Sequence, residues 1–382
     1  MGRIPKRAFA LAVSAILCLG CGKTEDSLPA AADASVYESP EELYDKALSE
    51  DVLIVYTVST RAVDAKDSFE KAYPGLTVEI RDLRSPNLID AVEEDHEKGL
   101  ANCDVVICND NSGDFKSRLV DTGIVLPYMP QDIGAHMKEG MAGEMITFLS
   151  EAELLLYNSA RYDSCPIDNI WALTEQKYRG TIYMPNPLRS FSTYAFCGAC
   201  MQHAEELAAA YEKYCGSPLE IPEGMNAAEV FWSRASENIV FTNSSDEVVE
   251  ALGSGAADFG IGVSSKLRLK DLGYDMEAVY RLEPFCGCRT SVAVMLAADS
   301  PNVNSARLFV RWLLGEADGK GEGYKPFCTA GTWSAREDVA DGNPVPLSEI
   351  DLIEPDQEKL ISDREHMEAF WSGILRQNNQ EK

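Results

Sequence analysis

The chain has 382 residues, 45% of them hydrophobic, so it is long enough to bury the cores of two domains. Its formal net charge at pH 7 is -28, which argues against nucleic acid and anionic membrane surfaces as partners. Net charge does not determine the sign of any single pocket, so a basic pocket remains compatible with this composition.

The N-terminus has the pattern of an export signal. Three basic residues precede an apolar run from Ala8 to Leu19 that is too short to span a membrane, and Cys18-Leu19-Gly20-Cys21 follows. This ending resembles a bacterial lipobox, which implies cleavage before Cys21 and acylation of its thiol. Cys18 stands where leucine is usual, so a plain secretory peptide is the alternative. We therefore expect a signal peptide at 1–21, a tether at 22–39 and a membrane-anchored lipoprotein of the cell envelope.

The first folded part alternates strands and helices. Val52 to Tyr56 is a continuous apolar strand, Ala62 to Tyr73 an amphipathic helix and Leu76 to Ile80 a second strand, which together make a βαβ unit. A helix at 87–98 and a buried strand at 104–108 continue the pattern. Because ligands of open α/β sheets bind outside the carboxyl ends of the strands, the candidate loops are 57–61, 83–87 and 109–112.

A second alternating set starts near Leu154. We expect strands at 154–158, 181–184, 238–241 and 258–262, with helices at 194–214 and 246–252 between them. Extended segments and helices follow up to residue 377. The fold class is therefore α/β, with two Rossmann-like lobes joined by two crossover strands. Lobe 1 takes 40–152 with a return segment 283–382, and lobe 2 takes 153–282.

Several short motifs occur together in an order that resembles a known family. Trp171-x-Leu173 precedes Tyr178-Arg179-Gly180-Thr181-Ile182-Tyr183-Met184-Pro185-Asn186-Pro187, and Gly255-Ala256-Ala257-Asp258 comes later. The order, over about Val52 to Ser334, resembles the extracellular solute-binding proteins of ABC importers, in the branch of ferric-ion, thiamine, phosphonate and sugar-phosphate receptors. The resemblance implies the type 2 periplasmic binding protein fold, delivery of a ligand to a membrane permease, and a protein that we expect to be a monomer.

Predicted strand ends carry hydroxyls, amides and a few cations. After the strand at 181–184, Arg189 and Ser190 lie at a helix start, where free N–H groups and the helix dipole favour an anion. Many such serines are simple caps, but together they suit phosphate or carboxylate oxygens. The predicted ligand is a small anionic or phosphorylated metabolite, without a cofactor. Its predicted ligand-binding residues are Ser59, Thr60, Arg61, Arg84, Ser85, Asn111, Ser112, Arg189, Ser190, Ser192, Thr193, Asn243, Ser244, Ser264 and Ser265.

Glu283 lies where the second crossover is expected to pass the cleft. Its carboxylate could accept a hydrogen bond from a ligand amine or sugar hydroxyl, so we include it among the predicted ligand-binding residues. A glutamate before a proline is often a solvated loop residue, which is the alternative.

Direct binding of ferric iron is the alternative function. Iron receptors of the resembled branch carry an adjacent tyrosine pair just after the strand that corresponds to 259–262, whereas this chain has Val263-Ser264-Ser265. The resemblance therefore gives no set of tyrosine ligands at this loop, and we predict no metal site.

The cysteines leave an odd number for an exported protein. Nine remain after Cys18 and Cys21, and Cys197-x-x-Cys200 with Cys286-x-Cys288 could be read as four thiolates for a metal. Because Cys197 and Cys200 fall inside an expected helix, buried packing thiols or one local disulfide are the favoured interpretation.

Enzymatic motifs are absent from the sequence. No HExxH, no Walker-type phosphate loop and no G-x-S-x-G elbow occurs, so we predict that the protein is not an enzyme. Two other readings stay open: an envelope hydrolase that uses Ser192 or Ser264 with an unlocated base, and a non-transport lipoprotein with a dry interface between the lobes.

Overall fold

The computed structural model describes residues 38–380, so the predicted signal peptide, the lipid site at Cys21 and nearly all of the tether lie outside the described residues. The first lobe begins with a helix whose N-terminus is stabilised by a capping box of Ser39 and Glu42. Its elements are α1 (Pro40–Ala47), β1 (Leu53–Thr57), α2 (Ala62–Ala72), β2 (Val78–Asp82), α3 (Ser85–Glu97), β3 (Val105–Asn109), η2 (Lys116–Val120), β4 (Val125–Leu126) and α4 (Gln131–Gly134).

The second lobe follows the long strand β5 (Thr147–Asn158). The helix expected at 194–214 is two helices that meet at His203. The elements are η3 (Ile170–Thr174), η4 (Gln176–Tyr178), β6 (Ile182–Pro185), α5 (Phe191–Gln202), α6 (Ala204–Cys215), α7 (Ala227–Ser236), β7 (Ile239–Thr242), α8 (Ser245–Gly253), β8 (Phe259–Val263), η5 (Ser264–Leu272) and β9 (Met276–Ala278).

The chain then returns through a second long strand, β10 (Gly287–Ala297). The remaining elements are α9 (Val303–Leu313), η6 (Lys325–Phe327), β11 (Trp333–Ser334), η7 (Leu347–Glu349), β12 (Leu352–Ile353), α10 (Gln357–Ser362) and α11 (Arg364–Gln380).

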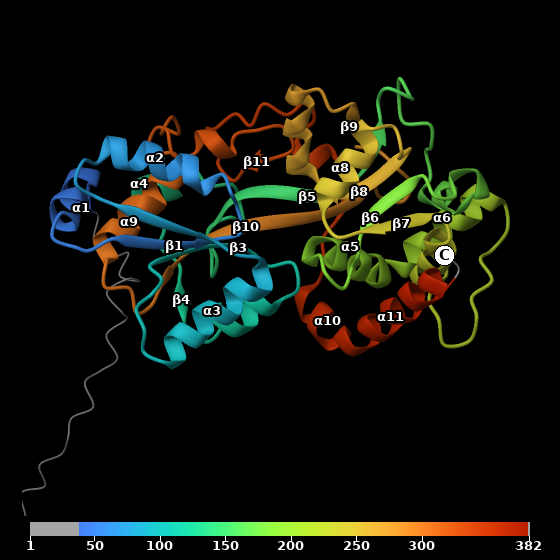
Figure 1. Cartoon of the computed structure of the whole chain (residues 1–382), viewed down its shortest axis with the longest axis horizontal. Helices are drawn as coiled ribbons and strands as arrows, with labels where there is room; N and C mark the ends of the chain where they lie inside the picture. The colour runs from blue at the N-terminus through green and yellow to red at the C-terminus, as the bar shows by residue number, and fades with distance from the viewer. Residues whose placement is uncertain (1–37, 381–382) are drawn as a thin grey trace, which may run out of the picture.

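One mixed sheet runs through both lobes in the order β2-β1-β3-β10-β5-β8-β6-β7. The strands of each lobe pair in parallel, β1 with β2 and β3, and β6 with β7 and β8. The two crossover strands β5 and β10 pair with each other antiparallel and pass from one lobe to the other (Figure 1). The predicted α/β class with two lobes and two crossover strands is confirmed.

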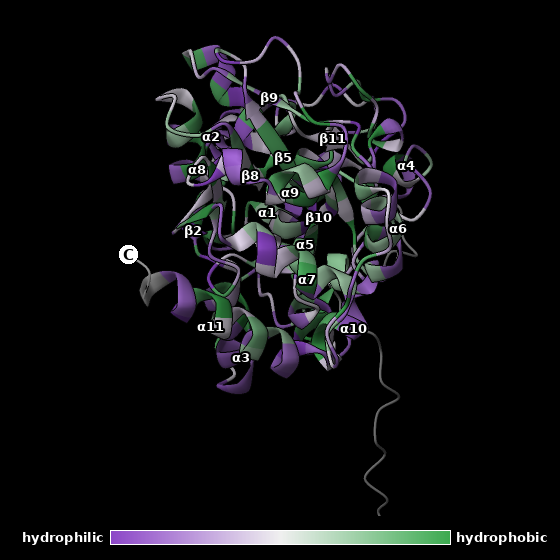
Figure 2. Ribbon diagram, turned by 90° about the vertical axis from the view of Figure 1, so that its right-hand side faces the viewer, coloured by the Kyte–Doolittle hydropathy of each residue, from purple (hydrophilic) through white to green (hydrophobic). Residues whose placement is uncertain are grey.

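Each lobe has its own hydrophobic core. Phe69, Phe309 and Trp312 pack in the first lobe, and Trp171 and Phe231 pack in the second. Hydrophobic residues gather on the central elements β5, α5 and α9, whereas outer turns of α3 and α11 are hydrophilic (Figure 2). Separate cores allow the lobes to move as units about the crossover strands.

The C-terminal segment corrects the expected return to lobe 1. Leu360 of α10 and Met367 and Trp371 of α11 belong to the core of the second lobe, and Trp371 lies 5.5 Å from the ring of Trp232. Figure 1 shows α10 and α11 beside α5, and α11 also contacts α7. The segment with Phe327 and Val339 packs with lobe 1, whereas apolar residues of α10 and α11 pack on α5 and α7 of lobe 2.

The predictions about the cysteines can be compared with the described residues. Within 38–380, every cysteine is a free thiol and no group of three or more His, Cys, Asp and Glu could hold a metal ion. Burial raises the pKa of Cys197, Cys200 and Cys288 well above the ordinary value of 9.0, so these thiols are packing residues. In the same range, no helix is both long and apolar enough to cross a membrane.

Candidate functional site

A cleft of about 830 Å³ lies between the lobes. Its walls are the loops after β1 and β2 and the end of β3 in the first lobe, and the loops after β6, β7 and β8 in the second. Leu149, Glu151 and Val292 of the crossover strands also line it. Parallel strands present their carboxyl ends at the same edge, so these loops meet where open α/β sheets bind ligands. The cleft is therefore the candidate site.

Four α-helices begin at the cleft. Arg61 and Arg84 precede α2 and α3 and make no side-chain cap, whereas Ser190 and Ser244 cap α5 and α8 through hydrogen bonds to backbone N–H groups. All four residues line the cleft. The first N–H groups of a helix have no partner inside the helix and carry the positive end of its dipole. This arrangement favours a negatively charged ligand.

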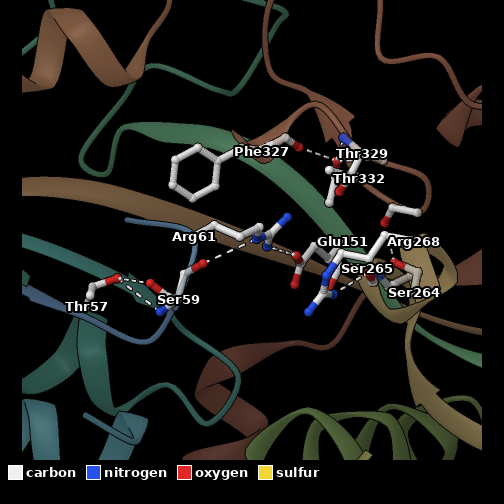
Figure 3. Close-up of polar contacts among 12 residues, drawn as sticks. Thr57, Ser59, Arg61, Glu151, Ser264, Ser265, Arg268, Phe327, Thr329 and Thr332 are labelled. Atoms are coloured by element: carbon white, nitrogen blue, oxygen red, sulfur yellow. Dashed lines mark hydrogen bonds and ion pairs between the residues drawn. The ribbon is translucent and has the colours of Figure 1, made fainter. Parts of the chain in front are cut away.

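Arg61 reaches from the start of α2 to the crossover strand (Figure 3). Its Nη2 donates to Glu151 Oε1 at 2.7 Å, its Nε donates to Ser59 Oγ at 3.3 Å, and its guanidinium carbon lies 5.3 Å from the centre of the Phe327 ring. Nη1 is buried and has no hydrogen-bond partner among the described residues. The guanidinium is thus held in place with one donor unused.

Arg268 is a second cation at the same place (Figure 3). Its Nη1 donates to the carbonyl oxygen of Ser265 at 2.6 Å, and it forms no ion pair with any residue between 38 and 380. Burial lowers the pKa of Arg268, and the positive charge of Arg61 lowers it further. Two guanidinium groups that repel each other would be stabilised by a bound anion.

The charge of the cleft differs in sign from that of the chain. Five cationic side chains line it against three carboxylates, although the chain carries a formal charge of -28. Glu151 is paired with Arg61, and Asp246 is paired with Lys266 at 2.5 Å. The five cations are Arg61, Arg84, Arg189, Lys266 and Arg268.

Most residues predicted from the sequence line this cleft. They come from both lobes, and they are hydroxyl, amide and guanidinium side chains. They are Ser59, Thr60, Arg61, Arg84, Ser85, Arg189, Ser190, Ser192, Asn243, Ser244 and Ser265. Their contact with a ligand stays a prediction.

Two predicted residues are near the cleft but turned into the protein. Thr193 is fully buried, and its hydroxyl donates to Glu153 Oε1 at 2.6 Å. Ser264 is also fully buried, and its hydroxyl donates to the carbonyl oxygen of Gly331 at 2.5 Å. Both hydroxyls are used for structural hydrogen bonds, so the prediction that they line the cleft is wrong.

Three further residues lie elsewhere. Asn111 lines a different cavity, and Ser112 is buried and donates to Asp114 at 2.9 Å, because the loop after β3 turns away from the cleft beyond Asn109. Glu283 forms an ion pair of 2.6 Å with Lys213 before β10 begins, so the crossover passes the cleft only at Val292, well beyond Glu283. These placements correct the predicted site.

Sequence reasoning missed several residues that line the cleft. Arg268 and Lys266 lie in η5, past the serine pair that drew attention to this loop, and Phe327 comes from the distant segment after α9. Glu151 lies in the part of β5 that extends the expected strand towards the N-terminus. The two cations just after Ser265 were the available signal, whereas nothing local indicated Phe327.

The sequence model of the family described as bacterial extracellular solute-binding protein matches residues 57–319. This span includes both lobes and the crossover strands. The chain belongs to this family. The protein is thus an extracellular or periplasmic solute-binding receptor that works with an ABC permease, and the predicted recognition is confirmed. No sequence of a curated protein matches this chain.

Solved structures share the fold. The fructose-6-phosphate-bound periplasmic binding protein AfuA from Actinobacillus pleuropneumoniae has a TM-score of 0.65 at 18% identity, covering 86% of this chain and 99% of that chain. Iron-bound HitA from Pseudomonas aeruginosa has a TM-score of 0.62 at 16% identity, covering 85% and 99%. At this identity the likeness concerns the fold alone, and the two neighbours hold different ligands.

Proposed function

We propose that the protein captures a small anionic or phosphorylated solute in the interlobe cleft and delivers it to its permease. The observation that carries this proposal is the meeting of four helix N-termini in one cleft with Arg61, whose Nη1 has no hydrogen-bond partner within residues 38–380. Backbone N–H groups and guanidinium donors are the groups that bind phosphate and carboxylate oxygens in proteins. Lobe closure would bring the donors of the two walls onto the same ligand.

The donor set favours an organic anion over a directly coordinated ferric ion. Fe(III) prefers hard anionic oxygens, and the described residues that line the cleft include no tyrosine and no histidine. Two of the three carboxylates in the lining, Glu151 and Asp246, already pair with cations. A ferric ion would have to enter with its own anionic chelator, which the cationic walls would also attract.

We also propose that a lipid on Cys21 attaches the protein to the membrane and that the protein acts as a monomer. The polar segment from residue 22 to residue 39 precedes the first described helix and would act as the tether. Incorporation of radiolabelled palmitate into the wild type but not into a Cys21→Ser variant would test the anchor.

Thermal unfolding tests the choice of ligand. The purified protein is heated with sugar phosphates, phosphonates, thiamine phosphates, polyamines and ferric citrate, each added separately. A ligand at about 100 times its Kd stabilises the folded state by about 2.7 kcal/mol, which corresponds to about 4 °C for a protein of this size. We expect one phosphorylated compound to give this shift.

The matched variant is Arg268→Gln, which removes a cation that has no ion-pair partner in the described chain. We expect this variant to fold and to lose most of the shift. A shift given by polyamines alone would contradict an anion site, and a shift given by ferric citrate but not by ferric-free citrate would favour the iron alternative.

A further inference from the structure

A second cavity, of about 410 Å³, lies between the lobes and shares no lining residue with the cleft. Asn111 of the first lobe, Arg289 of β10 and Gln357 of α10 line it. In β10, Val292 lines the cleft whereas Arg289, Thr290, Ser291 and Ala293 line this cavity, and the register with β5 is irregular between Val292 and Ala293. We call this cavity, which is separate from the cleft, the rear cavity.

Three of the residues that line the rear cavity each carry a buried polar atom without a hydrogen-bond partner within residues 38–380: Asn111 Nδ2, Arg289 Nε and Gln357 Oε1. Asn111 has only 3% of its surface exposed. An unpaired buried polar group costs about 1–3 kcal/mol, and native proteins leave few of them. Three in one cavity, from both lobes and the strand between them, point to a polar molecule that binds there.

Arg289 is held in position for such a contact. Its Nη1 donates to Glu354 Oε1 at 2.8 Å and its Nη2 to Ser150 Oγ at 3.3 Å, whereas Nε has no partner in the described part of the chain. Together with Asn111 Nδ2 it offers two N–H donors, suited to a carboxylate.

Other residues that line the rear cavity offer hydrogen-bond acceptors, which favour a cationic group. Glu139 is exposed and makes no ion pair with the residues that the structure describes, and Gln357 Oε1 is an unpaired acceptor. Lys116 is already paired with Glu144 at 3.2 Å. The rear cavity thus provides unused donors and unused acceptors, which suit a molecule with both an anionic and an ammonium group.

We propose that the rear cavity binds a small zwitterion of the free amino acid class. The carboxylate accepts from Asn111 Nδ2 and Arg289 Nε, and the ammonium group donates to Gln357 and Glu139. The volume of about 410 Å³ lies in the range of small-molecule sites. This site is separate from the anion cleft and does not depend on the identity of the transported solute.

Thermal unfolding and calorimetric titration of the purified protein with each standard amino acid test the proposal. At about 10 mM, an amino acid with a Kd of about 0.1 mM raises the unfolding temperature by about 4 °C. Asn111→Leu and Gln357→Leu each remove one unpaired atom at similar volume. We expect both variants to bind that amino acid at least 10-fold more weakly, and Asn111→Leu to be as stable as the wild type without ligand.

Arg268→Gln is the matched control, because it alters the cleft and leaves the rear cavity intact. The amino acid shift should persist in this variant. The proposal is overturned if no amino acid binds the wild type, if Gln357→Leu binds with unchanged affinity, or if Arg268→Gln abolishes binding, which would assign the amino acid to the cleft. Should Asn111→Leu fail to fold, Gln357→Leu decides.

Discussion

Glu153 lies in the crossover strand β5, and its side-chain carboxyl group is buried: 0% of the residue's surface is exposed. Oε1 accepts the hydrogen bond from Thr193, whereas Oε2 is buried without a partner in the described chain. The nearby groups that interact with its charge are Glu151 of the same strand, Cys197 of α5 and Cys288 of β10. Replacing Glu153 by Gln keeps the shape and the acceptor for Thr193 but removes the ionisation.

The pKa of Glu153 sets how much the free energy of unfolding of the wild type changes with pH. Burial raises the pKa of Glu153 from its ordinary value of 4.5 to about 7, although the hydroxyl groups of Thr193 and Ser192 lower it. The folded state therefore holds the proton over a range where the unfolded chain releases it. The wild type loses stability as pH rises from about 4.5 to about 7, and the difference corresponds to about 3 kcal/mol, at about 1.4 kcal/mol per pKa unit.

Guanidinium unfolding of the wild type and of Glu153→Gln, between about pH 4.5 and pH 8, measures this difference. We expect similar free energies of unfolding at the acid end and a variant that is more stable by about 3 kcal/mol at pH 8. Subtracting the two proteins cancels the titration of the other groups.

Thr193→Val provides the companion test. It removes a hydrogen bond that lowers the pKa of Glu153, so this pKa should rise. In proteins that carry Thr193→Val, the stability difference between Glu153 and Glu153→Gln should therefore reach its full size at a higher pH. A difference between wild type and Glu153→Gln that does not change with pH, or a wild type that is the more stable protein at pH 8, would refute the reasoning.

Three other outcomes are expected. The affinity of wild type for its anionic solute should fall with added salt, and Arg268→Gln should bind at least 10-fold more weakly with a shallower salt dependence, as titration calorimetry would show. Gly331→Ala should destabilise the protein by about 2–4 kcal/mol in a denaturant titration, because Gly331 has φ +83° and an added Cβ would lie 1.8 Å from the carbonyl oxygen of Ser264. In native protein, mass spectrometry after brief alkylation should find Cys215 and Cys328 modified and Cys197 unmodified, since only the first two are exposed; equal labelling would contradict the burial.

The strands and helices followed from local patterns. The apolar run at Val52 to Tyr56 and the amphipathic segment at 62–73 became β1 and α2 with small shifts of their ends. These patterns depend on neighbours a few residues away, so they can be read along the chain. The motifs around Trp171 and Pro185 indicated the family, because they occur in the same order along the chain as in its members.

The loops of the site were predictable for the same reason. A polar segment at the carboxyl end of a parallel strand lies at the ligand edge of the sheet wherever the strand is correctly placed. Arg61, Arg84 and Arg189 were found in this way. The sequence alone thus determined the α/β class, the two-lobed plan and most of the polar residues of the cleft.

Only the tertiary structure decided which of these groups are free to meet a ligand. Arg61 is paired with Glu151, 90 residues away, and the Thr193 hydroxyl donates a hydrogen bond to Glu153, 40 residues away. The side on which Asn111 lies depends on the turn of the chain after β3, which moved it from the cleft to the rear cavity. Such pairings arise when distant segments pack, so the availability of a side chain is a property of the folded molecule rather than of its local sequence.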